Sequence, residues 1–244
     1  MSLISIKVDC IAALREIKHL KEPDPSQAAV IAELAGADGI GCHLREDRRY
    51  IRDRDLYLLK EMVKTKLNLQ IAPVEDLIAR ALEVKPWMAT LMPLAAEDVI
   101  IRQGVDWGNN SDLYFETAAT LKGSGISVSC FIEPEIDDVK NAARAKFDAV
   151  ELNTFKYVTA DTLENAEMEL DKLEQMVNLA TKLNMAVNCG NGLNYRNIRP
   201  LAELGLIDEF NVGYSVIARA VMVGLERAVR EIVDIVHNLS EKAG

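Results

Sequence analysis

The sequence predicts a single-domain (β/α)8 TIM barrel over residues 1–244. Short β-branched or apolar runs alternate about eight times with longer stretches of helical periodicity, which is the pattern of a parallel sheet with crossover helices. The chain has 244 residues, of which 49% are apolar, and α/β barrels of this length form one unit. Residues 8–12 do not form the Gly-x-Gly-x-x-Gly turn that would favour an open nucleotide-binding sheet.

The predicted elements alternate in strand–helix order. A helix is expected at 26–35 because Asp24 suits the N-cap, Pro25 suits the first helical position and Gly36 can end the helix. No linker rich in Gly, Pro or Ser divides the chain. Strands are expected at 3–8, 39–43, 67–71, 88–92, 127–132, 149–153, 186–189 and 209–212, and further helices at 53–64, 74–84, 111–122 (after a long loop at 104–110), 135–145, 160–183, 197–204 and 215–239.

The composition narrows the class of protein. A formal net charge of −10 argues against nucleic acid or an anionic membrane as the main partner. No apolar run approaches the length of about 20 residues that spans a bilayer, and residues 1–3 do not begin a secretory signal. The four cysteines form no Cys-x-x-Cys pair, so we expect a reducing cytoplasm and no metal site; they are Cys10, Cys42, Cys130 and Cys189.

Polar residues gather where the predicted strands end. Active sites of such barrels lie at the C-terminal ends of the strands. Lys7 and Asp9 are two residues apart and are expected on one face of the first strand. The residues expected at this end are Lys7, Asp9 and Cys10, then 43–50, Gln70, Glu151 and Asn153, then 188–192 and 211–214.

Glycines follow the seventh and eighth strands. Gly190 and Gly192 come after the seventh, and Gly213 stands just before a predicted helix. Backbone N–H groups at these turns and at a helix N-terminus bind phosphate in many barrels, so a phosphorylated substrate is expected. The alternative is that the glycines only permit tight turns.

Residues 43–49 read His-Leu-Arg-Glu-Asp-Arg-Arg and begin at a strand end. His43 is the histidine expected to transfer protons. The alternative is that this charged run is solvated surface. His19 and His237 are expected on the surface.

This string resembles the pyridoxine 5′-phosphate synthase family. The resemblance extends from Val8 to about Arg230, and its further motifs are Pro-Asp-Pro-x-Gln-Ala-Ala at 23–29, Ala-Gly-Ala-Asp-Gly-Ile at 35–40, Arg-Asp-Arg-Asp at 52–55, Asn-Leu at 68–69 and Gly-x-Gly-Leu at 190–193. It implies an octameric barrel that needs no metal or organic cofactor. The family condenses 1-deoxy-D-xylulose 5-phosphate with 3-amino-2-oxopropyl phosphate, with loss of phosphate and water.

The resemblance also implies roles for individual residues. His43 matches the catalytic histidine, and Arg45 matches a substrate-phosphate arginine. Arg15, Asp9 and Glu151 are expected to contact substrate. Gly192 and Gly213 match backbone positions that hold phosphate.

Several positions depart from the family pattern. Gln70 replaces a catalytic glutamate and Asn191 a catalytic histidine, and an amide cannot exchange a proton near pH 7. Two such losses, if independent and uncompensated, would slow the reaction roughly 10⁴-fold or more. The other substituted positions, still expected to bind substrate, are Cys10, Lys18, Tyr50, Ile100 and Tyr214.

Lys7 is the most informative replacement. A lysine inside a barrel can form a Schiff base with a ketone, but an ion pair with Asp9 or Glu151 would keep it protonated. Cys10 and the other cysteines are open to a plain apolar role. Three hypotheses follow: the family reaction with His43 retained, a paralogue that uses His43 and Lys7 for another phosphorylated carbonyl compound, and a non-catalytic phosphate-binding barrel.

Overall fold

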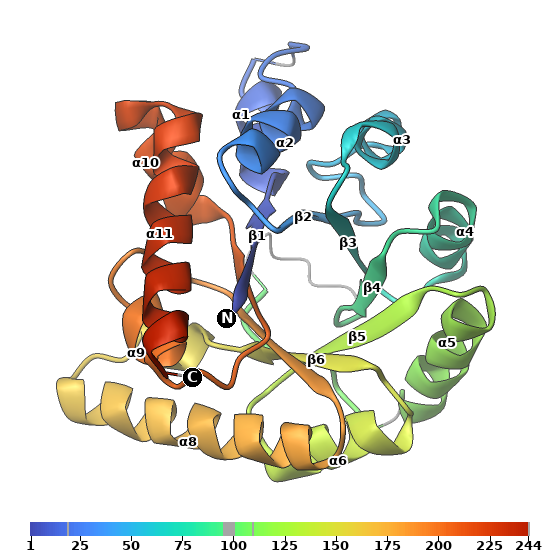
Figure 1. Cartoon of the computed structure of the whole chain (residues 1–244). Coiled ribbons are helices and arrows are strands. Elements are labelled where there is room, and N and C mark those ends of the chain that lie inside the picture. The colour runs from blue at the N-terminus through green and yellow to red at the C-terminus, as the bar shows by residue number, and fades with distance from the viewer. Residues whose placement is uncertain (19, 95–100, 109, 244) are drawn as a thin grey trace.

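The computed structural model describes residues 1–18, 20–94, 101–108 and 110–243 (Figure 1). Eight parallel strands close into a barrel in sequence order, with β8 hydrogen-bonded to β1. The predicted TIM barrel is therefore confirmed. Its strands are β1 (Leu3–Lys7), β2 (Gly39–His43), β3 (Lys66–Ile71), β4 (Met88–Leu91), β5 (Ser127–Ile132), β6 (Ala149–Asn153), β7 (Ala186–Gly190) and β8 (Glu209–Val212).

Helices surround the strands (Figure 1). In α2 the Asp24 carboxylate accepts a hydrogen bond of 2.9 Å from Ser26 N, and Pro25 is the first helical residue, as predicted. The helices are α1 (Asp9–Glu16), α2 (Pro25–Leu34), α3 (Asp53–Met62), α4 (Glu75–Val84), α5 (Ser111–Gly123), α6 (Ile136–Arg144), α7 (Phe155–Val158), α8 (Leu163–Lys182), α9 (Ile198–Glu203), α10 (Tyr214–Val223) and α11 (Leu225–Ala243).

Three features of the helices differ from the prediction. Helix α1 begins directly after β1, so Asp9 lies on a helix and not on the first strand. The four-residue helix α7 precedes α8. The helix expected over 215–239 is divided, because Gly224 takes φ +86° and ends α10 before α11 begins.

The alternation of side chains along the strands separates two regions. Ile4 and Ile6 of β1, with Ile40 and Cys42 of β2, are almost fully buried in the hydrophobic core. The intervening positions face the barrel interior, where many are polar or glycine. The buried polar residues of the strands are Ser5, Asn68, Gln70, Thr90, Ser129, Glu151, Asn153, Asn188, Glu209 and Asn211.

The segment after β4 is anchored beside the site by an aromatic cluster. Trp107 is 8% exposed, and its ring centroid lies 5.6 Å from that of Tyr114 and 6.4 Å from that of Phe147. At Gly104, an added Cβ would lie 2.5 Å from the backbone nitrogen of Glu133, so only glycine fits there. This packing holds residues 101–108 against the end of β5.

Candidate active site

The structure joins three of the expected site residues in one line across the barrel. Lys7 at the end of β1 donates a hydrogen bond to Gln70 Oε1 on β3. Gln70 Nε2 in turn donates to Glu151 Oε2 on β6, at 3.0 Å. Gln70 is thereby fixed in one orientation, with its carbonyl toward the amine and its amide N–H toward the carboxylate.

Burial controls the charge of Glu151. The residue is 2% exposed, and burial raises the pKa of its carboxyl group. Lys7 and Gln70 act in the opposite direction, because a nearby cation and an N–H donor stabilise the carboxylate. Glu151 is thus a titratable group whose pKa has moved toward neutrality, within hydrogen-bond reach of an amide that cannot titrate.

Asp9 connects Lys7 to His43. Its Oδ1 accepts a hydrogen bond of 2.6 Å from the backbone N–H of His43, while its Oδ2 lies 3.8 Å from Lys7 Nζ. Asp9 Oδ2 is buried and has no hydrogen-bond partner among the described residues. One carboxylate oxygen of Asp9 therefore lacks a hydrogen-bond donor in the described part of the chain, and Lys7 Nζ is the cation beside it.

His43 is held neutral. The pKa of its imidazole is lowered to about 3. Burial is the largest cause, and the positive charges of Lys7 and Arg45 act in the same direction. A neutral imidazole can accept a proton from substrate. His43 also pairs in register with Gln70, so both side chains point into the same end of the barrel.

Asn191 binds to the segment after β4. Its Nδ2 donates to the carbonyl of Ile101 at 2.8 Å and to Asn153 Oδ1 at 3.0 Å. Asn153 Nδ2 donates to Glu133 Oε1 at 2.6 Å, and Lys156 Nζ lies 2.8 Å from the other oxygen of Glu133. Asn191 therefore fixes the wall of the site and holds no titratable proton.

Glu133 and Lys156 are site residues that the sequence analysis missed. Glu133 follows β5 directly, and this position at a barrel strand end was the signal that could have identified it.

The glycines of the site are required by close packing. A Cβ on Gly190 would clash with Glu151 Oε1. Gly192 has φ +86°, and a Cβ there would lie 2.5 Å from Val158 Cγ2. A Cβ on Gly213 would lie 3.0 Å from Lys7 Cβ. Backbone N–H groups at Gly192 and Gly213 as phosphate ligands remain a prediction.

The charged loop after β2 is internally paired. Arg45 binds Asp47 in a bidentate manner, at 2.9 and 2.8 Å, and only 14% of the Arg45 side chain is exposed. Arg48 turns away from the barrel axis to Asp53 and Asp76. Of the three arginines, Arg45 is the one whose charge acts on His43.

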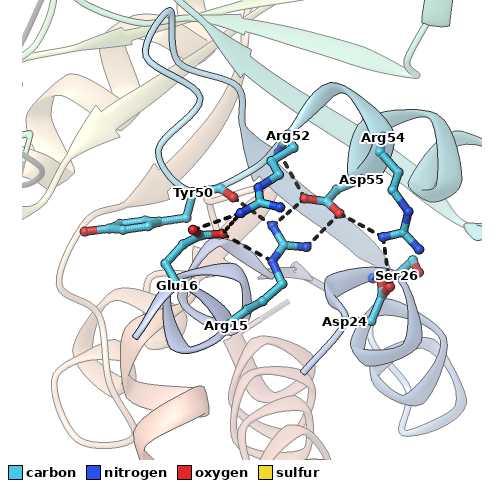
Figure 2. Close-up of polar contacts among 8 residues, drawn as sticks. All are labelled: Arg15, Glu16, Asp24, Ser26, Tyr50, Arg52, Arg54 and Asp55. Atoms are coloured by element: carbon cyan, nitrogen blue, oxygen red, sulfur yellow. Dashed lines mark hydrogen bonds and ion pairs between the residues drawn. The ribbon is translucent and has the colours of Figure 1, made fainter. Parts of the chain in front are cut away.

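Arg15 lies in a buried ion-pair cluster. Its guanidinium is 2% exposed and donates to both carboxylate oxygens of Asp55, at 2.8 and 2.7 Å, and to the carbonyl of Tyr50 at 3.0 Å (Figure 2). Arg52 and Glu16 border this cluster. These contacts engage its donors inside the protein and fix the end of the loop 43–50, and substrate binding by Arg15 stays a prediction.

The remaining expected residues lie around the rim. Tyr50 is partly buried, and its ring points away from the Arg15 cluster (Figure 2). Cys10 lies on α1, and burial raises the pKa of its thiol. Lys18 is exposed in the turn after α1, and Tyr214, which begins α10, is 78% exposed. Ile100 and His19 lie outside the described residues. His237 lies on α11, where its Nε2 is 2.9 Å from Asp38 Oδ2, and within the described ranges it forms no hydrogen bond or ion pair with the expected site residues named above.

Within the described ranges, no group of three or more His, Cys, Asp or Glu side chains is arranged to hold a metal ion. None of the helices in those ranges is both long and apolar enough to cross a membrane.

Comparison with known proteins identifies the family. The family model described as pyridoxal phosphate biosynthesis protein PdxJ matches residues 4–238. The chain belongs to the PdxJ family. The pyridoxine 5′-phosphate synthase of Geotalea uraniireducens is 45% identical over 236 residues, which are 97% of this chain and 99% of that protein. The synthase of a Synechococcus species is 46% identical over 232 residues, 95% of this chain and 97% of that protein.

Solved structures of other proteins share the fold. A phosphoribosyl anthranilate isomerase structure matches 98% of this PdxJ-family chain and 100% of its own, with a TM-score of 0.62 and 14% identity. A structure described as native KDPGal matches 99% of this chain and 97% of its own, with a TM-score of 0.61 and 11% identity. At these identities the likeness concerns the barrel alone.

Proposed function

We propose that this protein is a pyridoxine 5′-phosphate synthase of vitamin B6 biosynthesis, which joins 1-deoxy-D-xylulose 5-phosphate to 3-amino-2-oxopropyl phosphate. The observation that carries the proposal is the convergence of Asp9, His43 and Glu151 in one site of a chain that is 45% identical to such a synthase over 97% of its length. These three residues hold the polar contacts that imine formation and ring closure require.

His43 and Glu151 provide the proton transfers. His43 is neutral at physiological pH, since its pKa lies at about 3, and it accepts a proton from substrate carbon or oxygen. Glu151, whose pKa burial raises, can hold a proton and return it. Gln70 holds Glu151 in place by a hydrogen bond, and Asn191 holds the segment 101–104 through the carbonyl of Ile101.

Phosphate groups bind at the turns after β7 and β8. The lack of side chains at Gly192 and Gly213 supports this assignment, and the N-terminus of α10 directly follows Gly213. Arg45 supplies a further positive charge beside His43. The reaction on this site needs no metal or organic cofactor.

A second candidate function is a different condensation or isomerisation of a phosphorylated carbonyl compound. It is favoured by one observation: the two amides Gln70 and Asn191 both have their side-chain N–H groups bound within the protein, as fixed parts of the site. In that case His43 and Lys7 carry out the chemistry, and the reaction needs fewer proton transfers than the synthase reaction.

The protein is proposed to act as a homo-oligomer, an octamer as in the resembled family. Support comes from exposed apolar side chains on neighbouring helices: Ile17 and Leu20 at the end of α1, Leu34 of α2, and Met222 of α10 are between 60% and 79% exposed. Helices α1, α2 and α10 contact one another or α11. Such an apolar face is typical of a subunit interface. Four free cysteines support a reducing cytoplasm as its location.

The test is an assay of the purified protein with both substrates. Chromatography with fluorescence detection follows pyridoxine 5′-phosphate, and light scattering gives the oligomer mass. We expect product formation that His43→Asn abolishes, while His237→Asn, on the far α11, leaves it unchanged. Absence of product above a no-enzyme control would reject the synthase. Consumption of either substrate without this product would instead support the second candidate.

A further inference from the structure

We propose that Lys7 is a covalent catalyst, whose amine forms an imine with the ketone carbon of the sugar phosphate and then passes that carbon to the aminoketone. The proposal rests on the proposed function for the identity of the two substrates. It assigns a chemical task to Lys7, a position at which this chain departs from the family pattern.

The barrel provides a fitted position for the Lys7 stem. Lys7 is at the end of β1, where a Cβ on Gly41 would lie 3.0 Å from Lys7 Cγ and a Cβ on Gly213 would lie 3.0 Å from Lys7 Cβ. Any side chain at either glycine would press on the stem. The two glycines therefore leave room on both sides, and the amine is directed over the barrel axis to Gln70.

The contacts of the amine leave it able to react. Its hydrogen-bond acceptor is the neutral carbonyl of Gln70, and the carboxylate of Asp9 is at 3.8 Å, beyond direct hydrogen-bond distance. Had position 70 been a carboxylate, a close ion pair would hold the ammonium form. A neutral amide carbonyl can also accept a hydrogen bond from a neutral amine.

Asp9 is placed to remove the proton. Its Oδ1 is bound to the backbone of His43, while the buried Oδ2 faces Lys7 without a hydrogen-bond partner in the described part of the chain. Transfer of one proton from Lys7 to Asp9 Oδ2 frees the nitrogen lone pair. The same carboxyl group can then protonate the departing oxygen.

The step balances without an oxidant or reductant. The Lys7 nitrogen attacks the ketone carbon, and the carbon–oxygen π pair moves to oxygen. Asp9 carries two protons of the former ammonium group, one after the other, to that oxygen, which leaves as water while the protonated C=N bond forms. The amino group of 3-amino-2-oxopropyl phosphate next attacks this imine carbon. Its new C–N bond replaces the bond to Lys7: Asp9 takes one proton from the attacking nitrogen and gives it to the Lys7 nitrogen, which leaves as the free amine.

This route reaches the same imine between the two substrates as direct condensation. It divides imine formation into two steps. Water is lost when Lys7 reacts with the ketone, and the second substrate then only replaces one amine by another. The two substrates therefore need no dehydration between them, in a site where Gln70 and Asn191 cannot exchange protons. The phosphate anchored near Gly213 would hold the ketone beside Lys7, because the two residues are in contact.

Borohydride trapping tests the proposal directly. The intact protein is incubated with 1-deoxy-D-xylulose 5-phosphate alone, reduced with sodium borohydride, and analysed by mass spectrometry before and after digestion. We expect one reduced sugar-phosphate adduct, located on Lys7. The adduct should be lost in Lys7→Arg, which keeps the charge, and retained in Lys66→Arg, where the lysine instead stacks on Trp87 at 4.3 Å.

The wild-type result does not depend on the folding of a variant, and its outcomes separate the role of Lys7 from the proposed function. Absence of an adduct on the wild-type protein, or an adduct mapped to a residue other than Lys7, overturns the imine. Product formation without an adduct rejects only the role of Lys7. An adduct on Lys7 without formation of pyridoxine 5′-phosphate keeps the covalent role and rejects the synthase.

Discussion

Arg15 and Asp55 form a bidentate ion pair that joins α1 to α3, with both side chains at most 2% exposed. The same guanidinium binds the carbonyl of Tyr50 at 3.0 Å. The loop that begins with His43 therefore ends on a buried charge pair, which sets the position of its last residue (Figure 2).

Asp55→Ala is expected to lower the free energy of unfolding by about 3 to 5 kcal/mol, because it leaves the buried guanidinium of Arg15 without its partner. Chemical denaturation measures this. The control is Arg54→Ala: Arg54 also approaches Asp55, but its side chain is 63% exposed, so the loss should stay below about 1 kcal/mol. Equal losses in the two variants would contradict a buried pair that stabilises the fold.

Gln70→Glu is expected to lower the rate of product formation by about 10²-fold, because a carboxylate at position 70 would form a close ion pair with Lys7 and hold its amine in the ammonium form. Initial rates with both substrates at saturation measure the change. Asn188→Asp is the matched control, since it adds a buried carboxyl group next to Glu151 in the strand register but outside the hydrogen-bonded line. If Gln70→Glu is as fast as the wild type or faster, turnover does not need a neutral side chain beside Lys7.

The imidazole of His43 is expected to remain neutral throughout the range from pH 5 to 8. Its pKa is lowered from 6.5 to about 3 by burial and by the charges of Lys7 and Arg45. Removing the cation in Lys7→Met should therefore raise the pKa of His43, whereas Lys66→Met should not change it. Nitrogen-edited NMR of labelled histidine measures the pKa of His43 in both variants. A wild-type resonance that titrates near pH 6.5 would refute the neutral base.

Glu209 is expected to make stability depend on pH. This residue is 5% exposed, and burial, followed by the charge of Glu151, raises its pKa from 4.5 to about 7. The folded protein then binds more protons than the unfolded chain between these values, so the contribution to stability is full below pH 4.5 and is lost as the pH rises through 7.

Glu209→Gln should accordingly be more stable than the wild type at pH 8, by up to about 3 kcal/mol, with a smaller difference at pH 5. Denaturant titrations at the two pH values measure this. Glu203→Gln, on the exposed end of α9, serves as the control and should show no such dependence. A gain for Glu209→Gln that is the same at both pH values would exclude titration of Glu209 as its source.

The strands and the strand-end site could be predicted from the sequence because both depend on local pattern. Alternating side chains put Lys7, His43 and Gln70 at strand ends, and the structure confirms those ends. Helix α1 escaped prediction because no side chain caps it, and the division at Gly224 lies inside a continuous apolar pattern. Both depend on how the chain turns back on the barrel.

The role of Arg15 and the contact of Gln70 with Glu151 could not be predicted from local pattern. Each joins residues far apart in the sequence, 40 residues for Arg15 with Asp55 and 81 for Gln70 with Glu151. The local sequence around Arg15 is compatible with an arginine that binds substrate and equally with an arginine in a buried ion pair. Only the closure of the barrel brings Asp55 to it.

Phosphorus NMR of a reaction with both substrates tests the central claim most directly, because it follows phosphate release and product formation in one sample. We predict that inorganic phosphate and pyridoxine 5′-phosphate appear in equal amounts and at the same rate, and that both signals vanish in His43→Asn. Phosphate release without pyridoxine 5′-phosphate, or unchanged substrate signals with the wild-type protein, would contradict the account.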